Sequence, residues 1–198
     1  MLRGLSEPPY FTWLRSLLHR SSPPPGAEQP RPQFLVRFLS ELPDLWRTDS
    51  RQKVSRVAEQ VRQQAGQVLA GGAAAPERHL LMQSLNQTLN RMSGELDKFS
   101  VVCWWEPVAD RLCRHDGSDR ASVELLTATL RQSLQSPNPF IQLSALLALN
   151  RMGVKTDPAG LTLQAIGEPE QAANPELAAW INRLLAGEAV YPDPALFR

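Results

Sequence analysis

The sequence has few of the residues that favour β-strands. Its 198 residues include three isoleucines and 11 valines, against 30 leucines and 21 alanines. Leucine and alanine are strong helix formers, whereas β-branched residues favour strands. We therefore predict an all-α protein, built either as helical hairpins in a bundle or as a short stack of helical pairs.

Cysteine, long apolar runs and an excess of one charge are also missing. Two cysteines, Cys103 and Cys113, are too few for a disulfide-based secreted scaffold. No apolar run has the length of a transmembrane helix, and the N-terminus lacks the pattern of a secretory signal. The formal net charge is +1, which does not favour nucleic-acid binding. We expect a cytoplasmic protein with free thiols.

The common catalytic motifs are missing as well. The sequence contains no glycine-rich phosphate loop, no G-x-S-x-G nucleophile elbow, no H-E-x-x-H pair and no Rossmann fingerprint. We therefore predict no catalytic residue and no cofactor. The sequence does not predict a zinc site at Cys103, Cys113 and His115. A structural zinc ion needs four ligands, and no second pair of closely spaced ligands is present.

The 17 prolines divide the chain into segments. A proline-rich stretch at 21–33 predicts a stiff linker. It separates an N-terminal helix, within residues 1–20, from a helical body at 34–186. A tail at 187–198 follows the body.

The N-terminal helix is predicted at 10–20, where apolar residues recur at helical spacing. A helix of this length is not stable alone, so its apolar face must dock on something. That face could meet the protein's own core, a partner protein or a membrane surface. Its stripe consists of Tyr10, Trp13, Leu14, Leu17 and Leu18.

The first part of the body reads as helices at 34–47, 50–70 and 77–98. Pro43 is expected to end or kink the first of these. On the second, a stripe of valine and alanine faces the core, and Arg62 lies off it. The second and third helices are predicted to form an antiparallel hairpin. Residues 99–105 read as a buried continuation of helix, and Pro107 begins a helix at 106–114.

Helix starts in the second half carry a repeated signal. At three predicted helix starts an Asn or Asp stands directly before proline, and that pair supplies a capping side chain and a favourable first helical residue. The predicted helices are 119–135, begun by Ser118 or Asp119, then 139–152, 158–166 and 175–186, begun by Asn138-Pro139, Asp157-Pro158 and Asn174-Pro175.

Residues 125–153 resemble one unit of the HEAT/armadillo family of helical repeats. A first helix carries Leu126, Leu130 and Leu134, and a turn at 136–139 leads into a second helix. On that helix small and aliphatic residues recur, namely Ile141, Ala145, Leu146, Ala148 and Leu149. The resemblance implies a surface for protein–protein contact. A non-repeat helical bundle is the alternative.

One arrangement predicts chemistry instead of binding. His115-Asp116 form an HD pair, with His79 upstream and Asp157 downstream. This order resembles the metal-dependent HD phosphohydrolases, in which imidazole and carboxylate ligands hold divalent metals that activate water. However, the pair is followed by Gly117 and Ser118, a loop signature.

We accordingly expect a non-catalytic protein–protein interaction module: an adaptor, a scaffold or a subunit of a larger complex. The alternatives are an all-α HD-type phosphohydrolase and a peripheral membrane protein held by 10–20. Large aromatic and aliphatic residues at three places are the predicted partner contacts. They are Trp13, Leu17, Trp104, Trp105, Tyr191 and Phe197.

Overall fold

The computed structural model describes residues 32–48, 51–114, 119–157 and 174–197. These ranges contain helices and their connections but no strand, which confirms the all-α prediction. The helices predicted at 10–20 and 158–166 lie outside them. The elements are α2 (Pro32–Thr48), α3 (Arg51–Ala70), α4 (Ala75–Met92), α5 (Lys98–Val102), α6 (Glu106–Arg114), α7 (Arg120–Ser133), α8 (Pro139–Arg151), α10 (Pro175–Leu185) and a 3₁₀ turn η3 (Pro194–Phe197).

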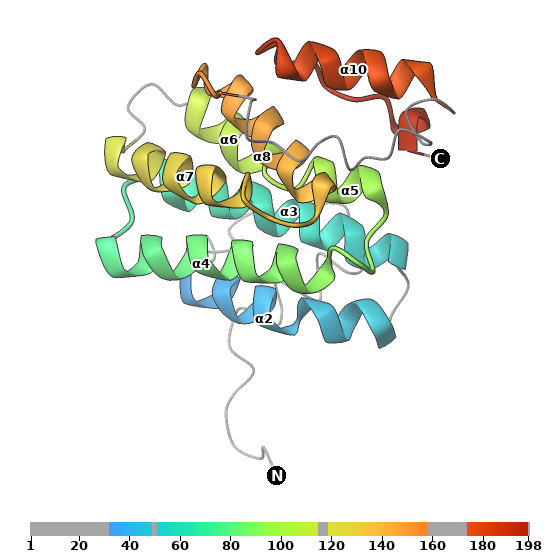
Figure 1. Cartoon of the computed structure of the whole chain (residues 1–198). Helices are drawn as coiled ribbons and strands as arrows, with labels where there is room; N and C mark the ends of the chain where they lie inside the picture. Colours follow the sequence, from blue (N-terminus) through green and yellow to red (C-terminus); the bar gives the residue numbers. More distant parts are fainter. Residues whose placement is uncertain (1–31, 49–50, 115–118, 158–173, 198) are drawn as a thin grey trace, which may run out of the picture.

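Helix α8 lies between α10 and the helices at the other side of the body (Figure 1). Helix α8 contacts α5, α6, α7 and α10, while α4 packs on α2 and α7. Helix α3 packs on α2 and α6. None of the helices in the described ranges has both the length and the apolar character needed to span a membrane.

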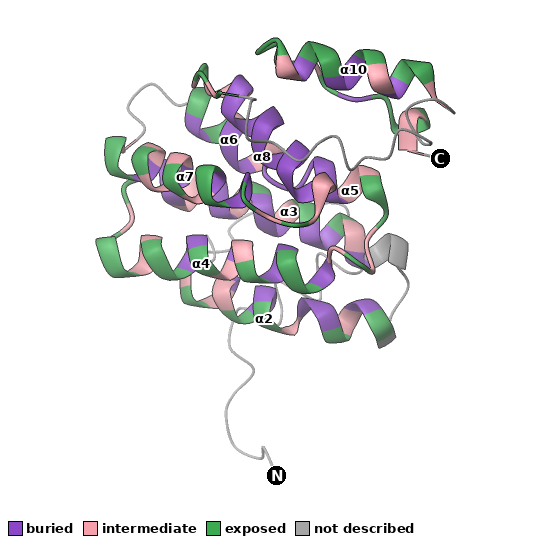
Figure 2. Cartoon of the chain, in the orientation of Figure 1, coloured by how far each residue is buried: buried purple, intermediate pink, exposed green. Residues whose placement is uncertain are grey.

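Helix α8 is buried on every side. All residues from 141 to 150 are buried, so the helix is coloured as buried along almost its whole length in Figure 2. A helix that is apolar on every face belongs in a protein interior. Three polar side chains, Gln142, Ser144 and Asn150, are buried with it, so the core of this protein is not purely apolar.

The predicted helix starts are confirmed at three places. The side-chain oxygen of Asp119 accepts a hydrogen bond from the main-chain N–H of Ala121 at 3.3 Å. Asn138 and Asn174 accept the N–H groups of Phe140 and Leu177, each at 3.0 Å. These bonds satisfy donors that a helix N-terminus would otherwise leave unpaired. Residues 125–153 fall in two helices that pack on each other, α7 and α8.

Pro43 does not end the first body helix. Helix α2 continues through it to Thr48. A proline inside a helix leaves the carbonyl four residues earlier without its donor, here that of Leu39. The Thr88 hydroxyl on α4 lies 3.0 Å from that carbonyl oxygen and 2.7 Å from that of Ser84. The single O–H of Thr88 thus reaches the carbonyl that Pro43 leaves without a donor, and shares its proton with the Ser84 carbonyl.

The helix predicted at 77–98 is shorter than expected. Helix α4 ends at Met92, and a turn containing Gly94 separates it from α5. Asp97 begins α5 by accepting the N–H of Ser100 at 2.8 Å. A local capping signal therefore stops the apolar pattern from being one continuous helix.

The predicted hairpin of α3 and α4 is wrong in its packing. The two helices follow each other after a tight turn, with Gly72 at φ +78°, but they touch at few positions. Helix α6 lies against α3 instead. Gly66 permits this approach, because a Cβ there would stand 3.0 Å from the Cβ of Arg111 and 3.2 Å from the carbonyl oxygen of Pro107.

The tail folds back over the helices. The indole N–H of Trp180 on α10 donates to the carbonyl oxygen of Val190 at 2.9 Å. Phe197 packs edge-on against Trp180, with ring centroids 5.7 Å apart, and also contacts Phe99. Phe197 of the tail therefore links Trp180 of α10 to Phe99 of α5.

The pairing of Thr88 with Pro43 can be tested by a double-mutant cycle. Thr88→Val leaves the Leu39 carbonyl buried without a donor and should lower the free energy of unfolding by about 1–2 kcal/mol. In a Pro43→Ala background the helix regains its own N–H donor, so Thr88→Val should cost less. Chemical denaturation measures both values.

Thr127→Val is the matched control for this cycle. The Thr127 hydroxyl donates only within its own helix, to the carbonyl oxygen of Val123. We expect this change to cost equally with and without Pro43. Equal costs of Thr88→Val in the two backgrounds would contradict the proposed role of Thr88.

Candidate functional site

A polar cleft lies where α3, α6, α8 and the tail meet. Its volume is about 500 Å³, within the range of ligand and recognition sites. Helices α3 and α6 form its walls, Arg151 stands at the C-terminal end of α8, and Tyr191 comes from the tail. Its lining consists of Glu59, Gln63, Gln67, Glu106, Pro107, Asp110, Arg111, Arg114, Arg151 and Tyr191.

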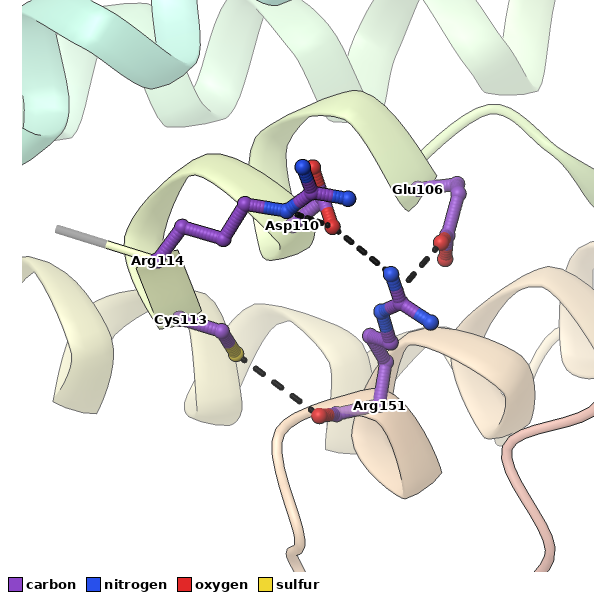
Figure 3. Close-up of polar contacts among 5 residues, drawn as sticks. All are labelled: Glu106, Asp110, Cys113, Arg114 and Arg151. Atoms are coloured by element: carbon purple, nitrogen blue, oxygen red, sulfur yellow. Dashed lines mark hydrogen bonds and ion pairs between the residues drawn. The ribbon is translucent and has the colours of Figure 1, made fainter.

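Most charges of the cleft are held in one ion-pair network (Figure 3). The guanidinium of Arg151 lies 2.8 Å from a carboxylate oxygen of Asp110 and 3.6 Å from one of Glu106. Arg114, one turn along α6, approaches the same oxygen of Asp110 at 2.9 Å. This network joins the end of α8 to α6 and fixes the carboxylates in place.

Glu106 is the most buried carboxyl group of the cleft. Its side chain is 11% exposed, and its Oε2 atom is buried without a hydrogen-bond partner among the described residues. Burial raises the pKa of Glu106, while Arg151 opposes the rise. Because the neutral form suits this place better than the ionised form does, Glu106 lowers the stability of the fold when it ionises.

The thiols next to the cleft are poor nucleophiles. Burial raises the pKa of Cys103 to about 12, and partial burial also raises the pKa of Cys113. A reactive cysteine needs the opposite shift, since the thiolate is the nucleophile. Both are free thiols, and Cys113 lies 3.7 Å from the carbonyl oxygen of Arg151.

Arg62 lies beneath the cleft and was not predicted to be buried. It is 8% exposed and donates to the carbonyl oxygens of Ala58, Cys103 and Trp104 at 3.0–3.2 Å. Its guanidinium carbon also stands 4.7 Å from the ring centroid of Trp104, a cation–π distance. Burial lowers the pKa of Arg62 to about 10, which leaves it charged at neutral pH.

The periodicity of α3 placed Arg62 off the core stripe because an apolar pattern identifies apolar core positions only. What requires the buried arginine is the turn after α5, which the sequence did not predict. That turn, at 103–105, leaves carbonyl groups of a buried segment without helical donors. A buried donor had to come from a neighbouring helix.

The structure corrects the predicted contact surface at Trp104 and Trp105. Both side chains are almost completely buried, so neither ring is available to a partner. The turn between α5 and α6 explains this, because it lets consecutive side chains point into the core as a continuous helix would not. The two indole N–H groups have no partner among the described residues.

The other predicted contact residues lie in different surroundings. Trp13 and Leu17 fall outside the described residues. Phe197 is half-buried against Phe99 and Trp180. Tyr191 is 55% exposed, lines the cleft and packs on Phe99 with ring centroids 6.2 Å apart.

The structure does not assemble the HD arrangement from the residues it describes. His115 and Asp116 lie outside the described ranges. His79 is exposed on α4, with Nδ1 3.0 Å from the carbonyl oxygen of Ala75, and Asp157 is exposed at the end of the segment after α8. In the described part of the chain, no three His, Cys, Asp or Glu side chains are grouped so as to hold a metal ion.

Comparison with known proteins gives no match: no family model fits the sequence, and no curated protein or solved structure is significantly similar to it.

Replacing Arg62 tests its structural role. Arg62→Met keeps most of the side-chain volume but removes the donors to the Cys103 and Trp104 carbonyls. We expect a loss of about 3 kcal/mol or more in the free energy of unfolding, because buried acceptors are left unpaired. Arg56→Met, at an exposed position of the same helix, should change stability little. Similar effects of the two substitutions in urea denaturation would contradict this role.

Glu106 should make stability depend on pH. A carboxyl group whose pKa is raised by folding contributes most to stability when the pH is below its pKa in the unfolded chain. This contribution is lost as the pH rises through its pKa in the folded protein. The stability of the native protein relative to Glu106→Gln should therefore fall as the pH rises from about 4 to 7. Denaturation of both proteins across this range measures the difference, and a constant difference would contradict the shift.

Proposed function

We propose that the protein is a non-catalytic interaction module, an adaptor or a subunit of a larger complex, and that it binds its partner at the cleft between α3 and α6. The observation that carries the proposal is the state of the cleft's reactive groups. Asp110 and Glu106 are engaged by arginines, and the neighbouring thiols have raised pKa values. Groups held in this way can recognise a ligand, and the protonated thiols do not offer a ready nucleophile.

The cleft also has the mixed chemistry of a recognition surface. Exposed Tyr191 supplies an amphipathic aromatic ring at its edge, and arginines line one wall. Tyrosine and arginine are enriched among residues that dominate binding energy at protein interfaces. The charged network that fixes Asp110 and Arg151 keeps this surface in one arrangement before a partner arrives, which lowers the entropy lost on binding.

Site-specific photo-crosslinking tests the proposed surface. A benzoylphenylalanine residue in place of exposed Gln63, on the cleft wall, should crosslink a partner in the native cell. The same residue in place of Gln87, exposed on α4 away from the cleft lining, is the matched control. We expect a discrete crosslinked species from the first position only, identified by mass spectrometry.

Crosslinks from Gln87 alone, or from neither position, would contradict binding at the cleft. A phosphate-releasing activity would favour the HD alternative instead, if it is abolished both by removing divalent metal with a chelator and by His115→Ala. Fold retention by each variant is checked by circular dichroism.

A further inference from the structure

The α3 wall of the cleft meets the rest of the protein in a fixed order. Arg62 donates to the carbonyl oxygen of Trp104, in the turn after α5, at 3.0 Å. Gly66, one turn further along α3, lies against α6, where a Cβ at this position would stand 3.0 Å from the Cβ of Arg111. The cleft therefore runs from the turn after α5, near Arg62, to α6, near Gly66.

Glu59 and Tyr191 lie at the end of the cleft near the turn after α5. Glu59 stands on α3 three residues before Arg62 and seven before Gly66. Tyr191 packs on Phe99 of α5, with ring centroids 6.2 Å apart. Both residues line the cleft, and both are exposed. A carboxylate and an aromatic ring are therefore accessible at the same end of the cleft.

The lining is balanced in charge as a whole but not at its two ends. It holds three arginines and three carboxylates. Four of these six groups are held in the ion-pair network (Figure 3). The other two, Glu59 and Arg111, form no ion pair with any residue in the described part of the chain. Seven helical residues rise about 10 Å, so Glu59 starts about 10 Å along the cleft from Gly66, against which Arg111 lies.

Contacts within the protein leave the Glu59 carboxylate able to accept hydrogen bonds from a ligand. Its Oε1 atom lies 3.5 Å from the Nε2 of Gln63, a long hydrogen bond. The buried guanidinium of Arg62 donates instead to main-chain carbonyl oxygens and lies 4.7 Å from the Trp104 ring centroid. A carboxylate binds a cation through charge-assisted hydrogen bonds, and an aromatic ring attracts the same charge through its π face. The two exposed groups together suit a basic side chain.

We infer, resting on the interaction function proposed above, that the partner places a lysine or arginine side chain at this end of the cleft. The cationic group lies against the ring of Tyr191 and donates to the carboxylate of Glu59. An acidic side chain in the same place would be repelled by the charge of Glu59. The selection is local, because it depends on these two groups and not on the total charge of the lining.

Peptide titration followed by nuclear magnetic resonance tests this inference. The probes are the acetylated and amidated hexapeptide Ser-Ala-Lys-Ala-Ser-Ala and its counterpart with norleucine, which keeps the aliphatic chain but lacks the ammonium group. The lysine peptide should shift the main-chain amide signals of Glu59, Gln63 and Tyr191. At low salt it should bind about fivefold more tightly than the norleucine peptide, because an exposed ion pair and a cation–π contact each contribute modestly.

Glu59→Gln should remove most of this preference. Tyr191→Leu should lower it more than Tyr191→Phe does, because phenylalanine keeps the aromatic ring. Glu176→Gln, at an exposed position of α10 outside the cleft lining, is the matched control and should keep the preference. The inference is overturned by equal binding of the two peptides to the native protein, by a preference that survives Glu59→Gln, by equal effects of the two Tyr191 substitutions, or by shifts that map elsewhere.

Failure of this inference is separable from failure of the proposed function. Crosslinking at Gln63 does not depend on the charge of the partner. A crosslinked segment without a basic residue would leave the interaction function standing and overturn only the basic specificity. Crosslinks absent from the cleft would overturn the function itself.

Discussion

The fold depends on supplying hydrogen bonds to carbonyl groups that end up inside it. The ends of α5 and α7 are buried, at 103–105 and 133–134. Each such end carries carbonyls without helical donors, and an unpaired buried carbonyl is costly. Side chains from other elements provide the missing donors.

The same solution recurs across the described chain. Arg62 donates to the segment after α5, Thr88 reaches the break that Pro43 makes in α2, and Gln142 donates to the carbonyl oxygen of Ser136 at 2.7 Å. Asn150, near the end of α8, donates to the carbonyl oxygens of Leu184 and Glu188 at the end of α10. These buried donors join helices that the apolar core also packs together.

Helix starts could be predicted from the sequence because capping is local: Asp119, Asn138 and Asn174 bond to residues two or three positions away. Which helices pack against one another could not be predicted from the sequence. The role of Arg62 depends on carbonyls more than 40 positions away in the chain, and no periodicity within α3 signals it. For the site, Tyr191 was singled out from the sequence, but the arginines of the cleft come together only through the packing of α6 on α3 and α8.

The link between Pro43 and Thr88 constrains the history of the sequence. A threonine at 88 is acceptable without the proline, because its hydroxyl bonds to the carbonyl of Ser84 within α4. A proline at 43 without the threonine leaves a buried acceptor unmatched. The order of the two substitutions therefore matters, because only the route that acquires the threonine first avoids a destabilised intermediate. Once the proline is present, replacing the threonine at 88 destabilises the protein.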